Sequence, residues 1–261
     1  MLAIRRYGVL SAVDTAFWVF RQHFQLLAVL GALIGSVNIL FGLGSLYLGP
    51  DPSILESNDP SAILLAYGEQ AGVLLLTMVI GLMVGAFGTA AATRIATQLV
   101  LGEEASLGDA MRVASSRFFS VLGATLVSSL ASALGFVFLI FPGIYIMLGF
   151  AFVAPVIVAE GLSATESLGR SWRLAQGQRW KILGAVILVV LMLGSLGIGV
   201  DLILRSVFSV EDVFTLQLAQ TIVSGLLNAV LSPIYYVVAV LFYFSARVEH
   251  EAFDVQKLTE G

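Results

Sequence analysis

The sequence has no cysteine and only two histidines, His23 and His250, in 261 residues. The lack of cysteine excludes disulfides, thiolate metal sites and cysteine nucleophiles. The histidines stand near opposite ends of the chain, and only His250 has acidic neighbours, Glu249 and Glu251. The motifs of zinc peptidases, serine hydrolases, P-loop proteins and dinucleotide-binding proteins are also missing. We therefore expect no catalytic residues, no metal and no cofactor, and the chain is predicted not to be an enzyme.

Charge is equally scarce. Charged residues make up 11% of the chain and hydrophobic residues 59%, whereas a soluble domain carries about 25% charged residues. So few polar side chains cannot cover a globule of this size, and lipid must cover much of its surface. The net charge of -4 argues against a nucleic-acid partner, which requires a basic patch. The composition predicts an all-α integral membrane protein whose partners are membrane lipids.

Long apolar runs predict six membrane spans, since a helix crosses a bilayer with about 20 apolar residues. The predicted spans are 24–48, 71–93, 119–141, 143–159, 182–204 and 217–245. The stretch 118–159 has no charged residue and would run about 60 Å as one helix, twice the hydrocarbon thickness. Because Pro142-Gly143 is a turn signal near its middle, two antiparallel spans are predicted there, with a re-entrant hairpin as the alternative.

The basic residues predict the orientation. With these spans, twelve of the thirteen basic residues fall on one side of the membrane, and only Arg205 falls on the other. The twelve are Arg5, Arg6, Arg21, Arg94, Arg112, Arg117, Arg170, Arg173, Arg179, Lys181, Arg247 and Lys257. Short cytoplasmic loops are enriched in Lys and Arg. The chain is therefore predicted to lie in the cytoplasmic (inner or plasma) membrane with both termini in the cytoplasm.

Three similar stretches precede the first, third and fifth spans. Each begins with a serine three residues before an acid, the pattern of a helix capping box. The pairs are Ser11 with Asp14, Ser106 with Asp109, and Ser163 with Glu166. We interpret the chain as one membrane domain with three repeat-like units, 11–100, 106–160 and 163–250, each with an interfacial helix and a helical hairpin. An arginine shortly before an aromatic residue follows each box, as in Arg21 with Phe24, Arg117 with Phe119 and Arg179 with Trp180. The alternative is that such boxes and Arg-aromatic pairs mark any cytoplasmic helix entry.

The stretches after the first and third boxes are amphipathic. Apolar residues recur at helical spacing in both. They are Val13, Phe17, Phe20 and Phe24 in the first stretch, and Leu168, Trp172 and Ala175 in the other. Such helices are predicted to lie in the headgroup plane with the aromatic face toward the lipid. The alternative is that they are connectors between spans.

The second half of the chain resembles a known family. The resembling residues are Pro142-Gly143-Ile144-Tyr145, Pro155, Glu160-Gly161 and Glu166-Ser167-Leu168-x-Arg170-Ser171-Trp172. They are similar to the membrane domain of some bacterial glycerophosphodiester phosphodiesterases, which also occurs in stand-alone membrane proteins. The resemblance implies a membrane anchor, with catalysis in a separate barrel. That barrel needs paired histidines and about 250 residues, so the catalytic activity is not expected here.

Polar residues in or near the spans are the default candidates for function. Asn38 and Asn228 lie within spans one and six and are predicted to bridge helices. Four charged residues stand near span ends, where their side chains reach water: Arg94, Glu160, Asp201 and Arg205. Two small-x-x-x-small pairs are predicted helix-packing sites: Gly31 with Gly35, and Gly81 with Gly85.

Three functions remain open at this point. The first is a non-enzymatic scaffold that forms homo-oligomers or binds partners, and organises or shapes the bilayer. The second is a carrier or channel for a small or lipidic substrate. The third is a membrane-embedded enzyme that acts on lipid head groups, for which Glu160 or Asp201 would have to be essential. The repeat, the interfacial helices and the lack of catalytic motifs favour the first.

Overall fold

The computed structural model describes residues 6–48, 59–208 and 213–251, and these residues contain helices and no strand. They form nine helices: α1 (Val9–Gln22), α2 (Phe24–Leu48), α4 (Pro60–Leu101), α5 (Leu107–Phe138), α6 (Ile140–Gly149), α7 (Val153–Glu160), α8 (Ala164–Ala175), α9 (Arg179–Val207) and α10 (Val213–Glu251). The predicted all-α class is confirmed.

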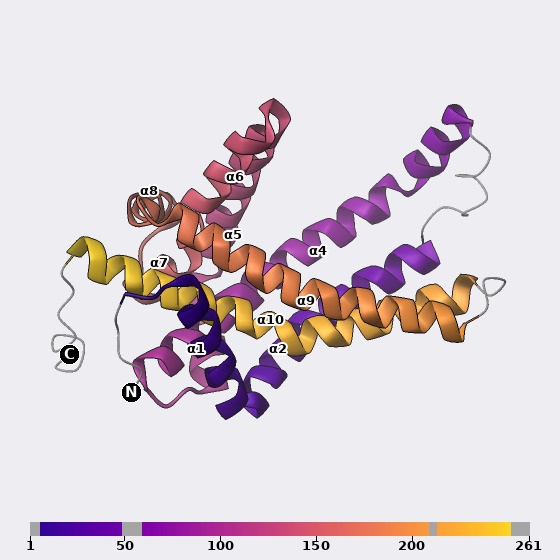
Figure 1. Cartoon of the computed structure of the whole chain (residues 1–261). Helices are drawn as coiled ribbons and strands as arrows, with labels where there is room; N and C mark the ends of the chain where they lie inside the picture. The colour runs from indigo at the N-terminus through magenta and orange to yellow at the C-terminus, as the bar shows by residue number, and fades with distance from the viewer. Residues whose placement is uncertain (1–5, 49–58, 209–212, 252–261) are drawn as a thin grey trace.

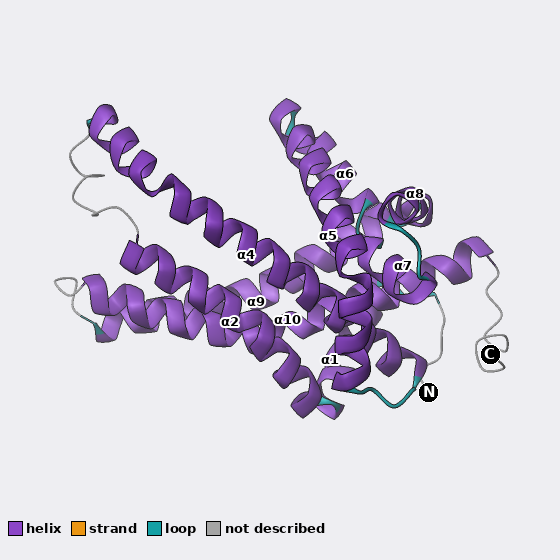
Figure 2. Ribbon diagram, turned by 180° about the vertical axis from the view of Figure 1, so that it is seen from behind, coloured by secondary structure: helices purple, strands orange, loops and turns teal. Residues whose placement is uncertain are grey.

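Helix α10 is the element around which the others pack. It runs beside α2 and α9 and also contacts α1 and α4, while α5 packs between α4 and α6 (Figure 1). The start of α1 and the end of α10 lie at the same end of the molecule, where the backbone N–H of Tyr7 donates to Ser245 Oγ at 3.0 Å. Figure 2 shows from behind that α4 and the α5–α6 pair diverge from this bundle toward their far tips.

Two glycines of α2 allow its close contact with α10. A Cβ on Gly31 would overlap the carbonyl oxygen of Ala229, and one on Gly35 would lie 2.8 Å from the carbonyl oxygen of Gly225. Gly225 in turn leaves room for the side chain of Ile39, which a Cβ on Gly225 would overlap. Small residues let helix backbones approach in lipid, where van der Waals contact drives association. Gly31 and Gly35 are therefore packing residues within the chain, as the sequence predicted.

Six helical segments of the described chain are long and apolar enough to cross a membrane, which confirms the predicted number of spans. They are Phe24–Gly44, Leu75–Leu101, Leu107–Phe138, Ile140–Glu160, Arg179–Val207 and Phe214–His250. Several helices are longer than predicted. Helix α4 has 42 residues, or about 63 Å, so it extends well beyond the hydrocarbon layer.

The turn between the third and fourth spans lies before Pro142-Gly143 rather than at it. Helix α5 ends at Phe138 and α6 begins at Ile140, with the extended residue Leu139 between them. Pro142 fits within the first turn of α6 because the N–H that proline lacks has no partner there in any case. Gly143 lies against Phe136, so that an added Cβ would overlap the ring. The glycine serves the close crossing of α5 and α6, not the turn.

The fourth span is broken in its middle. Helix α6 ends at Gly149 and α7 begins at Val153, so two helices of 10 and 8 residues share the apolar stretch that was expected to be one. A break inside a span leaves backbone N–H and C=O groups that need partners, because lipid supplies none. Carbonyl groups of the same turn satisfy the N–H groups of Phe150, Ala151 and Val153, and the groups that remain need side-chain partners.

The three predicted capping boxes differ in the structure. Only Ser163 and Glu166 form a complete box at the start of α8. The carboxylate of Glu166 accepts hydrogen bonds from the hydroxyl and from the backbone N–H of Ser163. Both lower the pKa of Glu166 below its ordinary value, and the bond from the hydroxyl has the larger effect. Ser106 Oγ accepts from the backbone N–H of Asp109. The Asp109 carboxylate does not reach back to Ser106 but accepts from Arg94. The predicted box of Ser11 with Asp14 is wrong, because α1 begins earlier, with Gly8 as its cap.

Two of the three predicted interfacial segments are separate helices, α1 and α8, whereas the second is continuous with α5. Each of these two helices has a face that is buried against the rest of the protein. The buried residues of α1 include Ala12, Ala16 and Val19, and α1 contacts α9 and α10. The threefold repeat stays a prediction.

Candidate functional site

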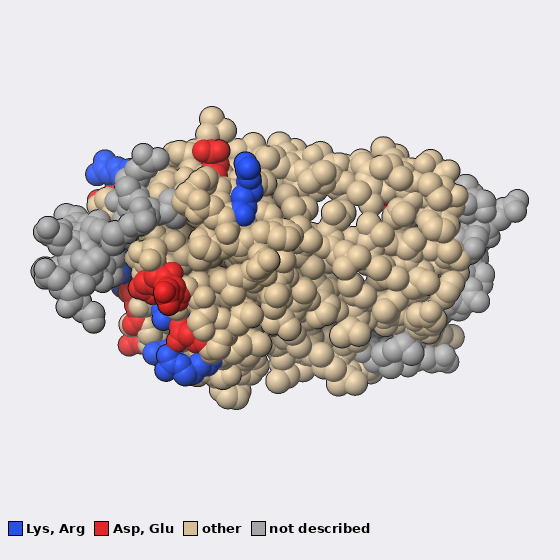
Figure 3. All heavy atoms as spheres, turned by 90° about the horizontal axis from the view of Figure 1, so that it is seen from below, with Lys and Arg blue, Asp and Glu red and all other residues tan. Residues whose placement is uncertain are grey.

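Most of the described charged side chains lie at the end of the molecule that holds both described chain ends. On the face shown in Figure 3 they cluster there, and the rest of the described surface carries little charge. The pair Asp201 and Arg205 is an exception near the far end of α9. At the charged end the described residues form four polar groups, around Asp109, around Glu160, around Arg179 and around Glu249, which accepts from Gln178 and Lys181.

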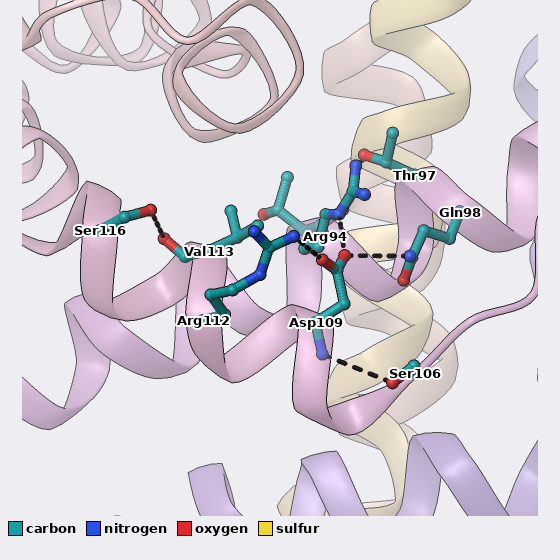
Figure 4. A network of polar contacts seen from close by, with 9 residues as sticks. Arg94, Thr97, Gln98, Ser106, Asp109, Arg112, Val113 and Ser116 are labelled. Carbon is teal, nitrogen blue, oxygen red and sulfur yellow. Dashed lines mark hydrogen bonds and ion pairs between the residues drawn. The ribbon is translucent and has the colours of Figure 1, made fainter.

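The first group joins α4 to the start of α5. Asp109 Oδ2 accepts from Arg94 Nε at 2.6 Å and from Gln98 Nε2 at 3.1 Å, and Oδ1 accepts from Arg112 Nη2 at 2.6 Å (Figure 4). A carboxylate that accepts from two guanidinium groups is held ionised. Arg94, a predicted candidate, thus ties two spans together at their charged end.

The second group joins three helices around Glu160, the last residue of α7. Its carboxylate accepts from Arg170 Nε of α8 at 3.0 Å and from the Tyr243 hydroxyl of α10 at 2.8 Å. Arg247 Nε lies 4.0 Å away, and Arg247 Nη1 donates to the Tyr243 hydroxyl. The Glu160, Arg170 and Arg247 side chains are each about one-fifth exposed, at 17%, 21% and 19%. Such a shielded carboxylate binds its partners more strongly than a surface ion pair does.

Ser171 of α8 supplies the partners that the broken fourth span needs. Its hydroxyl donates to the carbonyl oxygen of Gly149 at 2.9 Å and accepts from the backbone N–H of Phe152 at 3.1 Å. Trp172 covers Gly149 so closely that an added Cβ would overlap its ring. The family-like stretch therefore holds the break from one side, with Arg170, Ser171 and Trp172 in successive contacts.

The third group is a guanidinium that contacts two aromatic rings, which meet edge to face. Arg179 Cζ lies 3.8 Å from the ring centroid of Tyr145 and 4.4 Å from that of Trp172. Arg179 is 8% exposed and lines a cavity of about 650 Å³ between α6 and the start of α9, to which Pro142 also contributes. The remaining walls are mostly apolar.

A second cavity, of about 470 Å³, lies where α4, α5, α6 and α10 diverge. Hydroxyl side chains from three of these helices line it, among them Thr89, Ser128, Ser132 and Tyr236. The Thr89 and Tyr236 hydroxyls are 3.3 Å apart, and Ser132 donates to a carbonyl of its own helix. The hydroxyl oxygens keep acceptor capacity in a region that is otherwise apolar.

The other predicted site residues lie apart from these groups. Asn38 and Asn228 are exposed, and each donates to the carbonyl oxygen four residues earlier in its own helix, so the described contacts show no bridge between helices. Asp201 pairs with Arg205 at 2.7 Å and accepts from Gln220, near the opposite end of α9. Gly81 and Gly85 face open space.

Sequence reasoning missed Ser171, Arg179 and Tyr243 as interacting residues. Ser171 and Arg179 were visible within the family-like stretch and the basic-aromatic pair before the fifth span, but neither pattern names a partner. Tyr243 meets Glu160 across 83 positions of sequence, and no local pattern predicts such a contact. Among the described residues, no group of His, Asp and Glu side chains is arranged to hold a metal ion.

Comparison with known proteins gives one match. Residues 125–246 match the family described as a domain of unknown function (DUF7847). The matched region covers somewhat less than half of the chain and runs from α5 to α10, so it includes the broken span, the Arg179 group and the Glu160 group except for Arg247. Neither the curated proteins nor the solved structures contain a significant match. The resemblance to the phosphodiesterase membrane domain stays a prediction.

Proposed function

We propose that the protein is a non-enzymatic, multi-pass membrane scaffold that associates with further copies of itself or with partner proteins. The observation that supports this is the unpacked half of α4. From Leu75 to Ile80, five of six consecutive side chains are exposed and Thr77 is intermediate, although consecutive residues point to all sides of a helix. From Ala86 onward the same helix is buried, and Figure 1 shows its Pro60 end standing apart from the other labelled helices.

This half of α4 meets α2 where Thr77 lies near Gly44, but most of its surface lacks the helix–helix contacts that stabilise membrane proteins. Gly81 and Gly85 follow Ile80 in the same half, and a Cβ on either would meet no atom within 4 Å. The pair at Gly31 and Gly35 has the same spacing and is filled by α10. A second chain that packs on Gly81 and Gly85 would complete α4 in the way that α10 completes α2.

We expect the double substitution of Gly81 and Gly85 by isoleucine to shift the protein from an oligomer to a monomer, because the bulk would keep a second helix from close approach. Mass measurement in lipid nanodiscs reads this out. Gly194→Ile is the matched control, since Gly194 also faces open space but lacks a partner glycine four residues away. A wild-type chain that is strictly monomeric, or a double variant with unchanged mass, would contradict self-association.

The proposed location is the cytoplasmic membrane with both termini in the cytoplasm. It rests on the basic residues, which the sequence places almost entirely at one end of the spans. A chain with no native cysteine suits accessibility mapping. We expect Leu55→Cys to react with an impermeant maleimide on intact cells, and Ser115→Cys, at the charged end of α5, to react only after permeabilisation. The reverse pattern would overturn the orientation.

The second candidate function is a carrier or channel for a small or lipidic substrate. The hydroxyl-lined cavity supports it, because polar acceptors within a span region are uncommon unless they meet a polar ligand or another helix. Liposome flux and lipid-scrambling assays separate the two functions. Rates no higher than those of empty vesicles would exclude the carrier or channel and leave the scaffold as the remaining proposal.

A further inference from the structure

Arg179 is a buried cation with unused hydrogen-bond donors. Only 8% of the residue is exposed, and its Nε and Nη2 atoms have no hydrogen-bond partner among the described residues. An ionised group removed from water is costly unless a partner of opposite charge replaces the lost hydration. Native structures leave few such groups without a partner, so these two atoms indicate a ligand.

The aromatic rings do not replace that partner. The Arg179 guanidinium carbon lies over the face of each ring, 3.8 Å from the centroid of Tyr145 and 4.4 Å from that of Trp172, and these contacts stabilise the charge. The two ring planes meet at 79°, so the guanidinium can lie parallel to only one of them. The aromatic faces hold the cation in place, but they give Nε and Nη2 no acceptor oxygen with which to form a hydrogen bond.

Arg170 shows what this edge binds in the same protein. Its Nε and Nη2 atoms both donate to the carboxylate of Glu160, at 3.0–3.3 Å. A planar fork of this kind matches carboxylate and phosphate oxygens in pairs. Arg179 presents the same two donors with no carboxylate beside them, so an anion with two oxygens would complete the site.

The walls of the cavity beside Arg179 indicate the chemistry of the rest of the ligand. Its walls include Phe141, Ile144, Leu148 and Leu183, which suit an acyl chain rather than a free ion. Arg179 is also the first residue of α9, whose first turn carries no acid, so the positive end of the helix dipole adds to the attraction for an anion. Trp180, 76% exposed, is typical of the membrane–water interface.

We propose that the cavity between α6 and α9 is a binding site for an anionic phospholipid, with the phosphate on Arg179 and an acyl chain along the apolar wall. A headgroup that carries its own cation competes with Arg179 for the phosphate, so the site selects lipids with net negative charge. The site is independent of self-association, because neither Gly81 nor Gly85 contributes to it.

Tryptophan quenching by brominated lipid tests the site in the full-length protein. Trp180 lines the cavity, Trp172 lies against Arg179, and Trp18→Phe in every sample removes the third tryptophan. The protein is placed in phosphatidylcholine vesicles with a minor fraction of brominated phosphatidylglycerol or of brominated phosphatidylcholine with the same acyl chains. We expect binding of the anionic lipid to be stronger by about tenfold, the ratio typical of a hydrogen-bonded charge, and Arg179→Gln to abolish this preference.

Arg173→Gln is the matched control, because it removes one positive charge from an exposed residue of α8 at the same end and should keep the preference. Ile144→Phe fills the cavity without touching Arg179, and it should also lose the preference, which keeps the proposal testable where Arg179→Gln does not fold. An unchanged preference in either site variant, or an equal loss in Arg173→Gln, would overturn the proposal. Equal binding of the two brominated lipids, together with a stabilisation by inorganic phosphate that Arg179→Gln removes, would show a site for free phosphate instead.

Discussion

The Gly31→Ala substitution is expected to destabilise the fold more than any other single methyl group added to this chain. The new Cβ would overlap the carbonyl oxygen of Ala229, which belongs to the backbone of α10 and cannot rotate away. Helices α2 and α10 would have to separate, and their contact is the most extensive between any two elements. We expect a loss of about 3 kcal/mol, the upper range for overpacking, measured by reversible unfolding in detergent.

Gly194→Ala is the control for this experiment. It makes the same chemical change inside α9, where a Cβ meets no atom within 4 Å. Replacing a helical glycine by alanine favours the helix by up to about 1 kcal/mol, so this variant should be neutral or slightly more stable. Equal behaviour of the two variants would mean that α2 and α10 are not in the close contact described.

The second large effect is expected at Glu160. Glu160→Gln keeps the size of the side chain but removes the charge that faces Arg170, Arg247 and the Tyr243 hydroxyl. Breaking a fully buried ion pair costs about 3–5 kcal/mol, and the partial exposure of this cluster reduces the expected loss to about 2 kcal/mol. Reversible unfolding in detergent measures it, and the end of α7 should detach from α8 and α10.

Asp201→Asn provides the comparison. Asp201 and Arg205 form an ion pair one helical turn apart, with side chains 41% and 58% exposed, and such surface pairs contribute at most about 1 kcal/mol. The stability of this variant should therefore change little. If Glu160→Gln were equally mild, the Glu160 cluster would be a solvated surface network and not a joint between three helices.

The predictions for Gly31 and Glu160 concern two different ways in which this fold is held together. The apolar half of the bundle depends on close backbone contact between α2 and α10, and the charged end depends on polar joints that tie short elements to it. Helix α8 is the clearest case, because it has few apolar residues to bury, and Arg170, Ser171 and Trp172 hold it to α7 and α6. The same helix positions Trp172 against Arg179, so the proposed lipid site depends on these joints.

Composition and hydrophobic run length predicted the class and the number of spans. Apolar runs longer than about 20 residues must be helical in lipid, because only a helix satisfies its own backbone within one segment. The local rules were less reliable at helix ends. Pro142-Gly143 is a turn signal in water-soluble chains, but here it lies inside α6, which begins at Ile140, and Gly143 lets Phe136 pack closely. The Ser11 box failed because α1 begins earlier, at Val9, with Gly8 as its cap.

An all-α membrane protein with six spans can be predicted without coordinates, since these properties follow from composition and from runs of neighbouring residues. The place where the fourth span breaks, the pairing of carboxylates with arginines and the glycine pair that is filled depend on how the helices pack in three dimensions. Glu160 and Tyr243, or Gly31 and Ala229, are far apart in the chain and meet through the packing of whole helices. Their contacts therefore depend on the sum of all helix–helix interactions, which no local pattern contains.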